Sequence, residues 1–344
     1  MEDGGSLATR DGSRSVHVVA IGASAGGIEA LRNLVGALPE SFPAAVLVVL
    51  HLPTHGTSVL PQILARAGRL AAVQATDGLV LEGGRIYVAP PDCHLLVDSG
   101  AVCLDHGPRI NGHRPAVDPL FRSVAATYGP FCAGVVLSGV LDDGTAGLMA
   151  IKQAGGVTLV QDPAEALYDT MPRTASELVW PDHIGTAEQL GRVLAEIATP
   201  LPPDLPKAAE RGNEEHLVEV DRGSSDSPQP GTVTGLTCPE CNGAIWLDES
   251  QAIPRFACRT GHAFSIESFA AAQTERVEAA LWTALRTLEE RAALYRRMAA
   301  RQREGGNARI SERWALRAES AVQHAFVLRE VIEQFDGARE AGAA

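Results

Sequence analysis

The sequence predicts an α/β fold, in which helices cover both faces of a doubly wound, mostly parallel sheet with Rossmann-like topology. From residue 15 to about residue 198, short apolar runs alternate with segments of helical periodicity, which is the pattern of parallel strands joined by crossover helices. The first apolar run, Val18–Ile21, is followed by a glycine-rich turn and by a helical segment that begins at Ile28. Ligands bind where the strands of such sheets end, so this turn is a candidate functional site.

The individual elements of this region follow from the same two periodicities. Strands are expected at Val18–Ile21, Ala45–Leu50, Arg85–Ala89, Leu95–Val97, Ala133–Leu137 and Val157–Val160. Helices are expected at Ile28–Leu38, Ser58–Ala67, Pro115–Tyr128, Ala146–Ala154, Pro172–Leu178 and Ala187–Glu196. The closely spaced short strands within residues 83–104 predict a small antiparallel insertion or edge. The crossovers between parallel strands should be right-handed.

Changes in composition divide the 344 residues into five parts. Residues 1–14 are a polar, glycine-rich tail that we expect to be disordered, and residues 15–198 form the α/β domain. Residues 199–235 are rich in proline and polar residues and are interpreted as a linker. A compact metal-binding module at 236–264 and an antiparallel helical hairpin at 265–337 follow.

Charge, hydropathy and cysteine usage exclude several classes of function. The formal net charge of -13 argues against a nucleic-acid partner, which needs a basic face. No window approaches the ~20 uninterrupted apolar residues of a membrane span. The polar N-terminus lacks the apolar core of a signal peptide, and a disulfide framework is not expected in a chain of this size. We therefore expect a cytoplasmic protein that binds no nucleic acid and does not insert into a membrane.

The glycine-rich turn carries one reactive side chain, Ser24. The sequence from Gly22 to Gly26 matches the pattern G-x-S-x-G, which is typical of a serine nucleophile on a sharp turn between strand and helix. The positive end of the following helix would stabilise an oxyanion formed there. A turn that only packs a helix against a strand, or a phosphate-binding loop, gives the same pattern. The dinucleotide fingerprint and the P-loop lysine are both absent.

A serine nucleophile needs a base, and His51 is the first candidate. It follows the apolar run Ala45–Leu50. Because neighbouring parallel strands end side by side, His51 can reach Ser24. His55 is a nearby alternative. Three further histidines in loops stay open as candidates: His94, His106 and His113.

The base needs an orienting carboxylate, which the third strand end supplies. The run Ala133–Leu137 leads into the segment SGVLDDGTAG, where Asp142 or Asp143 can orient the imidazole. An aspartate before a helix can also act only as a helix cap. The chain order serine, histidine, aspartate differs from the order in α/β-hydrolases and argues against that fold family.

Residues 16 to about 198 resemble the catalytic domain of the chemotaxis protein-glutamate methylesterase family, CheB. The matching stretches are AIGASAGG, VVLHLP, YVAPPDCHLLV, RPAVDPLFRSVA, VVLSGVLDDGTAG, GGVTLVQDP and DTMPRTA. The resemblance implies a triad of Ser24 as nucleophile, His51 as general base and Asp143 as the group that orients the base. It also implies hydrolysis of γ-glutamyl methyl esters on chemoreceptors with no catalytic cofactor, and deamidation of glutamine as a second activity.

The sequence departs from the family pattern in three respects. The family usually carries an N-terminal phospho-receiver domain, for which we expect no room before Val18. Ala25 stands where the family often has threonine, and Val140 where it has methionine. Backbone N–H groups can nevertheless form an oxyanion pocket, and we expect Ala25 and Val140, with Gly26 and Gly27, to line the oxyanion and substrate site.

The segments Cys238-Pro-Glu-Cys241 and Cys258-Arg-Thr-Gly-His262 have the spacing of a metal site. A Cys-x-x-Cys turn lets two thiolates reach one ion, and Cys258 and His262 supply two more ligands. Three sulfurs and one imidazole fill a tetrahedral site and suit a structural Zn²⁺, because no coordination position stays open. The alternative is a chance spacing of reduced cysteines. This tail also resembles the zinc-containing C-terminal extension of some methylesterase-like proteins.

Two helical segments end the chain. Residues 265–303 predict one long helix with Ser265 as its cap, and residues 310–335 predict a second helix after the break at Gly305 and Gly306. Apolar residues spaced by threes and fours on both segments predict packing into an antiparallel hairpin. We expect this hairpin to bind a partner or a second copy of the chain.

We interpret the whole chain as a serine hydrolase of chemosensory signalling that removes methyl groups from methylated receptors. The alternative belongs to a different class: an adaptor whose methylesterase-like domain binds methylated receptor helices or a signalling partner without turnover. The complete set of triad residue types favours the enzyme. Nucleotide binding at the glycine-rich turn is a third interpretation.

Overall fold

The computed structural model describes residues 15–51, 58–201 and 231–342, with side chains described as far as residue 334. Two compact units are present, one through Phe269 and one from Ala270 onward. The expected N-terminal tail lies outside the described residues, as does most of the expected linker. No described helix is long and apolar enough to cross a bilayer.

The first unit contains a seven-stranded, all-parallel sheet with the strand order β3-β4-β2-β1-β7-β8-β9. Its strands are β1 (Val18–Ala23), β2 (Ala45–Leu50), β3 (Ala71–Gln74), β4 (Arg85–Val88), β7 (Cys132–Val136), β8 (Val157–Gln161) and β9 (His183–Gly185). From β1 the chain adds β2, then the edge strand β3, and then β4 between β3 and β2, before it adds β7, β8 and β9 on the other side of β1. The order therefore reverses next to β1, and such a switch point is where doubly wound sheets bind ligands.

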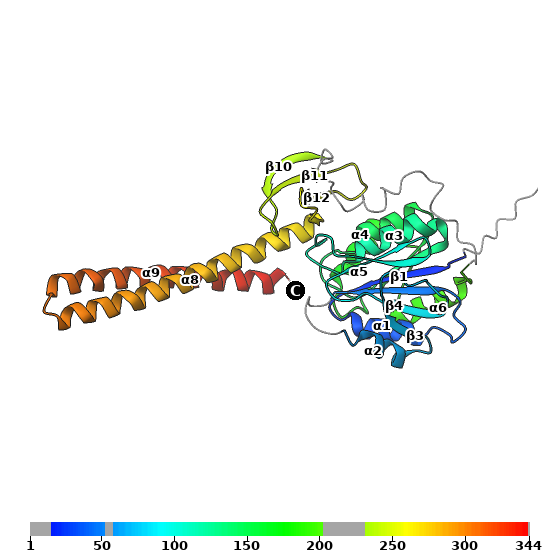
Figure 1. Ribbon diagram of the computed structural model, residues 1–344, viewed down its shortest axis with the longest axis horizontal. Helices are drawn as coiled ribbons and strands as arrows, with labels where there is room; N and C mark the ends of the chain where they lie inside the picture. Colours follow the sequence, from blue (N-terminus) through cyan, green and yellow to red (C-terminus); the bar gives the residue numbers. More distant parts are fainter. Residues whose placement is uncertain (1–14, 52–57, 202–230, 343–344) are drawn as a thin grey trace, which may run out of the picture. The chain divides into compact units, whose positions relative to one another are not determined.

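Helices cover both faces of this sheet, as Figure 1 shows. One face carries α1 (Gly27–Gly36), α2 (Leu60–Ala67) and α6 (Ala187–Ile197), and the other carries α3 (Val117–Tyr128), α4 (Thr145–Gln153) and α5 (Thr170–Val179). A short 3-10 turn, Gly129–Phe131, leads from α3 into β7. The predicted doubly wound fold is confirmed.

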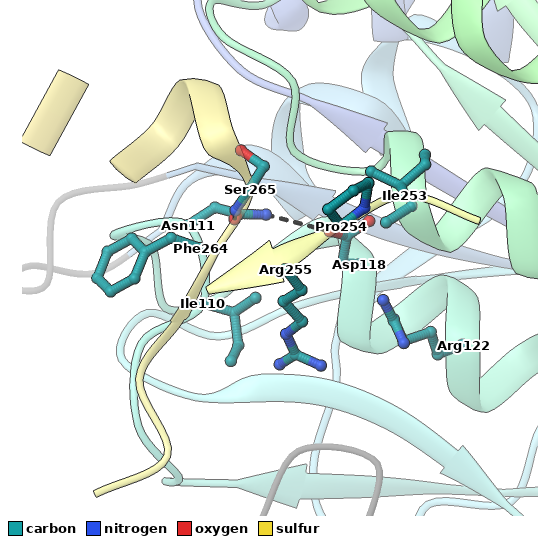
Figure 2. A pocket seen from close by; sticks show the side chains of 10 residues that line it. Ile110, Asn111, Asp118, Arg122, Ile253, Pro254, Arg255, Phe264 and Ser265 are labelled. Atoms are coloured by element: carbon teal, nitrogen blue, oxygen red, sulfur yellow. Dashed lines mark hydrogen bonds between the residues drawn. The ribbon is translucent and has the colours of Figure 1, made fainter. Parts of the chain in front are cut away.

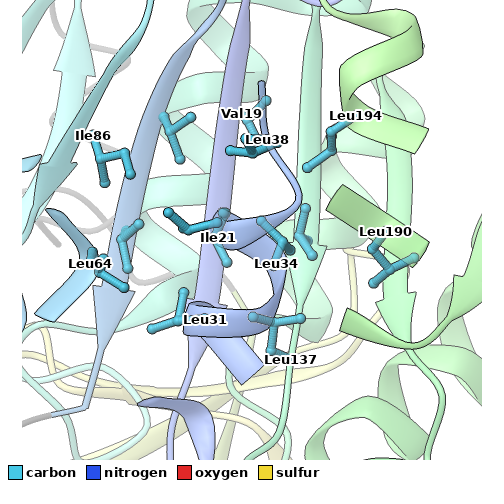
Figure 3. Packing of buried hydrophobic residues seen from close by; sticks show 14 of the residues in the cluster. Val19, Ile21, Leu31, Leu34, Leu38, Leu64, Ile86, Leu137, Leu190 and Leu194 are labelled. Atoms are coloured by element: carbon cyan, nitrogen blue, oxygen red, sulfur yellow. The ribbon is translucent and has the colours of Figure 1, made fainter. Parts of the chain in front are cut away.

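The central strands are apolar along their whole length because both faces are covered. On β1, Val19 and Ile21 face α1, while Val18 and Ala20 face the opposite layer, since successive side chains of a strand point to opposite faces. Figure 3 shows the first of these clusters, with the side chains of α1, α6 and the strands interdigitated. The residues labelled there are Val19, Ile21, Leu31, Leu34, Leu38, Leu64, Ile86, Leu137, Leu190 and Leu194.

Three details of the sheet differ from the expectation. The strands β3 and β9 were not predicted, because they are short edge strands with largely exposed or half-buried side chains and little periodicity. Within residues 83–104, β4 joins the parallel sheet. Only β5 (His94–Asp98) and β6 (Ala101–Asp105) form the antiparallel ribbon.

A second sheet follows the undescribed residues 202–230. It is antiparallel in the order β10-β11-β12-β13. Its strands are β10 (Thr232–Thr237), β11 (Ala244–Asp248), β12 (Arg255–Cys258) and β13 (Ala263–Phe264). The first strand begins within the stretch expected to be linker. A bridge between Ile110 and Ala263 joins this sheet to the α/β domain, and both residues are buried together with Ala116.

The chain ends in two long helices, α8 (Ile266–Glu304) and α9 (Ala308–Gly342). Within the second unit they run antiparallel: the Ser311 hydroxyl donates to the Ala299 carbonyl at 2.8 Å, and the Tyr295 ring lies 5.3 Å from the Trp314 ring. Farther along the hairpin, buried contacts involve Leu285, Ala325 and Ile332. The two helical segments therefore pack as the hairpin that the sequence predicts.

Candidate active site

Three side chains from three neighbouring strand ends meet at the carboxyl edge of the parallel sheet. Ser24 directly follows β1, His51 directly follows β2, and Asp143 lies in the loop after β7. The Ser24 hydroxyl lies 3.0 Å from Nδ1 of His51, and Nε2 of His51 lies 2.7 Å from Oδ2 of Asp143. The register of the parallel strands creates this meeting point, because β1 pairs residue by residue with both β2 and β7.

The Asp143 carboxylate is almost fully buried and accepts several hydrogen bonds. Its Oδ2 accepts from His51 and from the backbone N–H of Val117 at 2.7 Å. Its Oδ1 accepts from the N–H groups of Gly144 at 3.0 Å and Asp118 at 3.3 Å. Val117 and Asp118 are the first residues of α3, where unpaired N–H groups and the helix dipole stabilise a negative charge.

These contacts decide the charge state of Asp143. Burial alone would raise the pKa of this carboxyl. The hydrogen bond and charge of His51 and the N–H group of Val117 lower the pKa by more than burial raises it. The net result is a pKa well below the usual range for aspartate. Asp143 therefore stays ionised and can hold the N–H of the His51 ring, which leaves the other ring nitrogen to accept the Ser24 proton.

Two glycines allow the start of α3 to approach this carboxylate. A Cβ atom on Gly22 would lie 2.2 Å from a methyl carbon of Val117, and one on Gly144 would lie 2.7 Å from the same carbon. Any side chain at these positions would push Val117 away from its hydrogen bond with Asp143. Gly144 also has a φ of +92°, which favours glycine.

Two residues that the sequence did not single out also contact the Asp143 carboxylate, namely Asn111 and Asp118. The Asn111 amide donates to Oδ1 of Asp143 at 2.9 Å and to Oδ2 of Asp118 at 3.1 Å. Asp118 also accepts from the N–H of Gly147 at 2.6 Å. Burial, and then the charge of Asp143, raise the pKa of Asp118 to about 7. A single asparagine in a loop has no periodic signal, so only the coordinates identify it.

The structure distinguishes between the two adjacent aspartates. Asp143 faces His51, whereas Oδ1 of Asp142 accepts from the hydroxyls of Ser265 at 2.7 Å and Ser268 at 3.0 Å. Burial raises the pKa of Asp142. The two neighbouring carboxylates thus contact different parts of the chain: one faces the triad and the other faces the beginning of α8.

Of the alternative histidines, only His113 lies beside the triad among the described residues. Its ring stacks on the ring of His51, with centroids 3.6 Å apart and planes 12° apart. His94 instead contacts the Pro108 carbonyl at 3.0 Å, and His106 lies against Cys93. His55 falls outside the described residues.

Backbone hydrogen bonds show which N–H groups of the expected oxyanion site are already used within the protein. The N–H of Gly27 donates to the Ser24 carbonyl at 2.9 Å, because α1 begins at Gly27 and this bond closes the turn. Gly27 therefore cannot supply an oxyanion donor. The N–H groups of Ala25, Gly26 and Val140 make no backbone hydrogen bond within the described parts of the chain. They remain the candidate donors next to Ser24.

Exposed apolar side chains form a rim beside Ser24. A Cβ on Gly26 would lie 2.9 Å from Cβ of Leu167 and 3.2 Å from the Tyr168 ring, so the loop before α5 lies directly against the Ser24 turn. Leu167 and Tyr168 are 72% and 46% exposed, and Val140 is 40% exposed. Large apolar side chains next to an accessible serine provide a surface on which another protein can pack.

A second cluster, of potential metal ligands, lies in the small antiparallel sheet. The ligand atoms of Cys238, Cys241, Cys258 and His262 all lie within 4.8 Å of one another. The sulfurs of Cys241 and Cys258 are 3.6 Å apart, and Cys258 lies 3.5 Å from Nδ1 of His262. Two thiolates at Zn–S distances of about 2.3 Å in a tetrahedron would be separated by roughly 3.8 Å. The donor set and its spacing therefore fit a tetrahedral metal ion.

The fold and the Ser-His-Asp arrangement define the class as a doubly wound α/β domain with a serine hydrolase-type triad. The profile of the CheB methylesterase family matches residues 19–194, and the chain belongs to this family. The resemblance noted in the sequence is therefore confirmed.

Individual relatives agree with this assignment. The chain is 41% identical over 182 residues to the protein-glutamate methylesterase/protein-glutamine glutaminase 2 of Anaeromyxobacter dehalogenans, a match that covers 53% of each chain. It is 43% identical over 165 residues to the protein-glutamate methylesterase/protein-glutamine glutaminase 1 of Xanthomonas euvesicatoria, covering 47% of this chain and 46% of the other. The chain thus spans about half the length of the curated relatives it matches.

A solved structure covers the same region. The CheB methylesterase catalytic domain of Thermotoga maritima matches 53% of this chain and 98% of its own length, with 33% identity and a TM-score of 0.51. The similarity therefore concerns the α/β domain.

Because His113 is buried against His51, we expect the free energy of unfolding to fall in acid. Burial, and then the charge of His51, lower the pKa of His113 from 6.5 to about 4. Between these values the unfolded chain binds the proton more tightly, so the folded state loses stability as the pH falls through this window. The loss at about pH 5 should be on the order of 2 kcal/mol. His113→Phe keeps a ring against His51 and should remove this loss.

Chemical denaturation of both proteins at about pH 5 and about pH 7.5 measures the effect. His183→Phe is the matched control, because it replaces an exposed histidine that lies outside the stacked pair. Equal pH dependence in the parent and His113→Phe would contradict the assignment.

Proposed function

We propose that this chain is a protein-glutamate methylesterase. It would be a serine hydrolase that removes methyl groups from glutamate γ-methyl esters on chemoreceptor-type proteins, and it would also deamidate glutamine to glutamate. The observation that carries this proposal is the hydrogen-bonded line from the Ser24 hydroxyl through the His51 ring to Asp143, in a domain of the CheB methylesterase family. The names of the relatives support both activities.

The proposed reaction has two steps. In the first, Nδ1 of His51 takes the Ser24 proton while the hydroxyl oxygen attacks the ester carbonyl. Backbone N–H groups of Ala25, Gly26 and Val140 are the candidate donors to the oxyanion. Methanol leaves with the proton from His51, and a glutamyl ester remains on Ser24. In the second step, the same imidazole takes a proton from water, which attacks this ester. The imidazole then returns the proton to the Ser24 oxygen as the glutamate is released.

The surface next to Ser24 supports a protein as the substrate. Val140, Leu167 and Tyr168 form an exposed apolar rim beside the nucleophile, and Ile28, on the adjacent α1, is 44% exposed. A small ester needs no such surface, whereas a methylated receptor helix can pack its apolar side chains against it. The cluster of Cys238, Cys241, Cys258 and His262 has the chemistry of metal-binding, reduced cysteines, which supports a reducing compartment, the cytoplasm, as the place of reaction.

Replacing the proposed nucleophile should abolish turnover. Ser24→Ala removes the attacking oxygen, so methanol release from a methylated chemoreceptor should fall about ten-thousand-fold or more, because triad residues act as a unit. Release is measured with radiolabelled methyl esters, and the folded state is followed by circular dichroism. Ser41→Ala, at an exposed serine in a loop, should retain the parent rate.

The same measurement separates the enzyme from an adaptor. An adaptor would bind the methylated receptor in a pull-down and release no methanol from it. Turnover of Ser24→Ala within about tenfold of the parent would exclude Ser24 as the nucleophile.

We also propose that Cys238, Cys241, Cys258 and His262 bind one structural Zn²⁺. Their ligand atoms lie close enough together to share one ion, and four protein ligands leave no position open for a substrate. When bound, zinc would join the turn before β11 to the turn after β12, and so hold together a sheet that buries few apolar side chains.

Purified protein should contain about one zinc per chain. Cys238→Ser should lose the metal and lower the temperature at which the small sheet unfolds, and a strong chelator should have the same effect on the parent. Cys103→Ser, outside this cluster, is the matched control and should retain zinc. Unchanged melting after chelation and in Cys238→Ser would exclude a structural metal.

The helical hairpin is the candidate surface for self-association. On α9, Leu316, Phe326 and Val327 are between 55% and 62% exposed, although they are large and apolar. We propose that they pack against a second copy of the hairpin, because such a row of apolar side chains is typical of helix–helix interfaces.

Sedimentation should therefore show a dimer of the full chain, and the double variant Phe326→Ser/Val327→Ser should be a monomer at the same concentration. Trp180→Ser, at an exposed tryptophan of the α/β domain, controls for a general loss of surface hydrophobicity. A monomeric parent would contradict self-association through the hairpin.

A further inference from the structure

The Asn111 side chain connects the triad to the C-terminal part of the first unit. Its amide nitrogen donates to Asp143 and Asp118, and its amide oxygen accepts from the backbone N–H of Ser265 at 2.8 Å. Figure 2 shows Asn111 between Asp118 and Ser265 in the wall of a small pocket. The Asn111 residue is only 5% exposed.

These partners determine the orientation of the amide. If the amide were flipped, its oxygen would face the ionised carboxylate of Asp143 and its NH₂ group would face the N–H of Ser265, so both of these contacts would become repulsive. The observed orientation uses both N–H groups and the oxygen. Because the site is buried, leaving any of these groups unpaired costs free energy.

The backbone of Asn111 is held by the same C-terminal segment. Its N–H donates to the Ala263 carbonyl at 2.7 Å, so β13 adjoins the loop that carries Asn111. Asn111 has a φ of +53°, a left-handed conformation that asparagine tolerates better than most residues. Strand β13 therefore fixes the position from which the side chain reaches Asp143.

The neighbour of Asp143 makes a second connection to the same segment. Asp142 accepts hydrogen bonds from the hydroxyls of Ser265 and Ser268, and the Ser265 hydroxyl also accepts from the backbone N–H of Ser268 at 3.0 Å. Ser265 thus caps α8 while its own N–H points to Asn111. The two adjacent aspartates and Asn111 are joined through one residue, Ser265.

The position of Asp143 matters because its Oδ2 must face the His51 ring. Its other oxygen, Oδ1, accepts a hydrogen bond from the Asn111 amide. Among the described residues, His51 and Asn111 are the only side chains that donate to this carboxylate. Without that donor, Oδ1 keeps only the backbone N–H groups of Gly144 and Asp118, and the two buried carboxylates of Asp143 and Asp118 lose their shared partner. Small displacements of a catalytic group cost large factors in rate.

We propose that Asn111 is a positioning residue for Asp143, and that the Ala263–Ser268 segment holds the Asn111 amide in place, so that hydrolysis by Ser24 depends on the C-terminal module, by which we mean residues 231–269 of the first unit. This inference rests on the proposed serine hydrolase activity. It extends that proposal, because it assigns the C-terminal module a role in the geometry of the triad.

The test uses the full chain and two probes of Ser24: labelling by a fluorophosphonate and hydrolysis of p-nitrophenyl acetate. Asn111→Ala should lower the labelling rate and kcat by about a hundredfold and leave KM nearly unchanged, because the residue does not touch the substrate. The acid limb of its rate–pH profile should shift to higher pH, because an Asp143 carboxylate that has lost a donor holds the protonated His51 ring more strongly.

A pair of variants at Ser265 isolates the contact from the C-terminal segment. Ser265→Ala keeps the backbone N–H and loses only the hydroxyl contacts, whereas Ser265→Pro also removes the N–H that donates to Asn111. Ser265→Pro should be about tenfold slower than Ser265→Ala. In the Asn111→Ala background the two substitutions should have equal rates, because the acceptor is gone.

The outcomes separate this inference from the proposed function. A parent that neither labels at Ser24 nor hydrolyses the ester would contradict both. A labelled parent together with parental rates in Asn111→Ala and in Ser265→Pro would overturn the positioning role alone. Circular dichroism and metal content monitor folding. If Asn111→Ala does not fold, the Ser265 pair decides, and equal rates in that pair overturn the inference.

Discussion

One buried negative charge, the carboxylate of Asp143, is the constraint on which the arrangement of the site depends. A carboxylate removed from water is stable only when donors replace its hydration. Here the donors come from separate parts of the chain: the ring of His51, the start of α3, the turn at Gly144 and the amide of Asn111. Each donor that holds the charge also fixes one element relative to the others.

The packing around this charge explains several residues that make no contact with Ser24 or His51. Val117 lies so close to Gly22 and Gly144 that neither position has room for a side chain. Gly147 allows α4 to approach α3 and donates to Asp118. Close backbone packing of this kind brings N–H groups to the carboxylate without a polar side chain. The close approach of the helices that these glycines allow therefore also supplies donors that stabilise the negative charge.

The sequence predicts the main architecture and the positions of Ser24 and His51 because both depend on local pattern and on one rule of topology. Apolar runs locate the strands, and parallel neighbours end at the same edge. The choice between Asp142 and Asp143 depends on distant residues. Adjacent carboxylates have the same local sequence context, and their environments differ because Ser265, far along the chain, contacts only one of them.

Other features escaped prediction for related reasons. Asn111 lies in a loop and belongs to no periodic segment, so its role follows only from three-dimensional contacts. The N–H of Gly27 closes the first turn of α1, a detail that the sequence did not predict because the exact start of a helix is not visible in a glycine-rich sequence. The short strands β3 and β9 lie at sheet edges, where few buried residues mark a strand.

The bond between Ser265 and Asn111 joins residues separated by 154 positions. During synthesis from the N-terminus, every strand of the parallel sheet leaves the ribosome before Ser265 does, and domains generally fold as units in that order. The α/β domain can therefore assemble its core while the Asn111 amide still lacks its final acceptor contact. A nascent chain would acquire its complete hydrogen-bond network only after the small sheet has formed, which would delay full hydrolytic competence until the residues through Ser268 have left the ribosome.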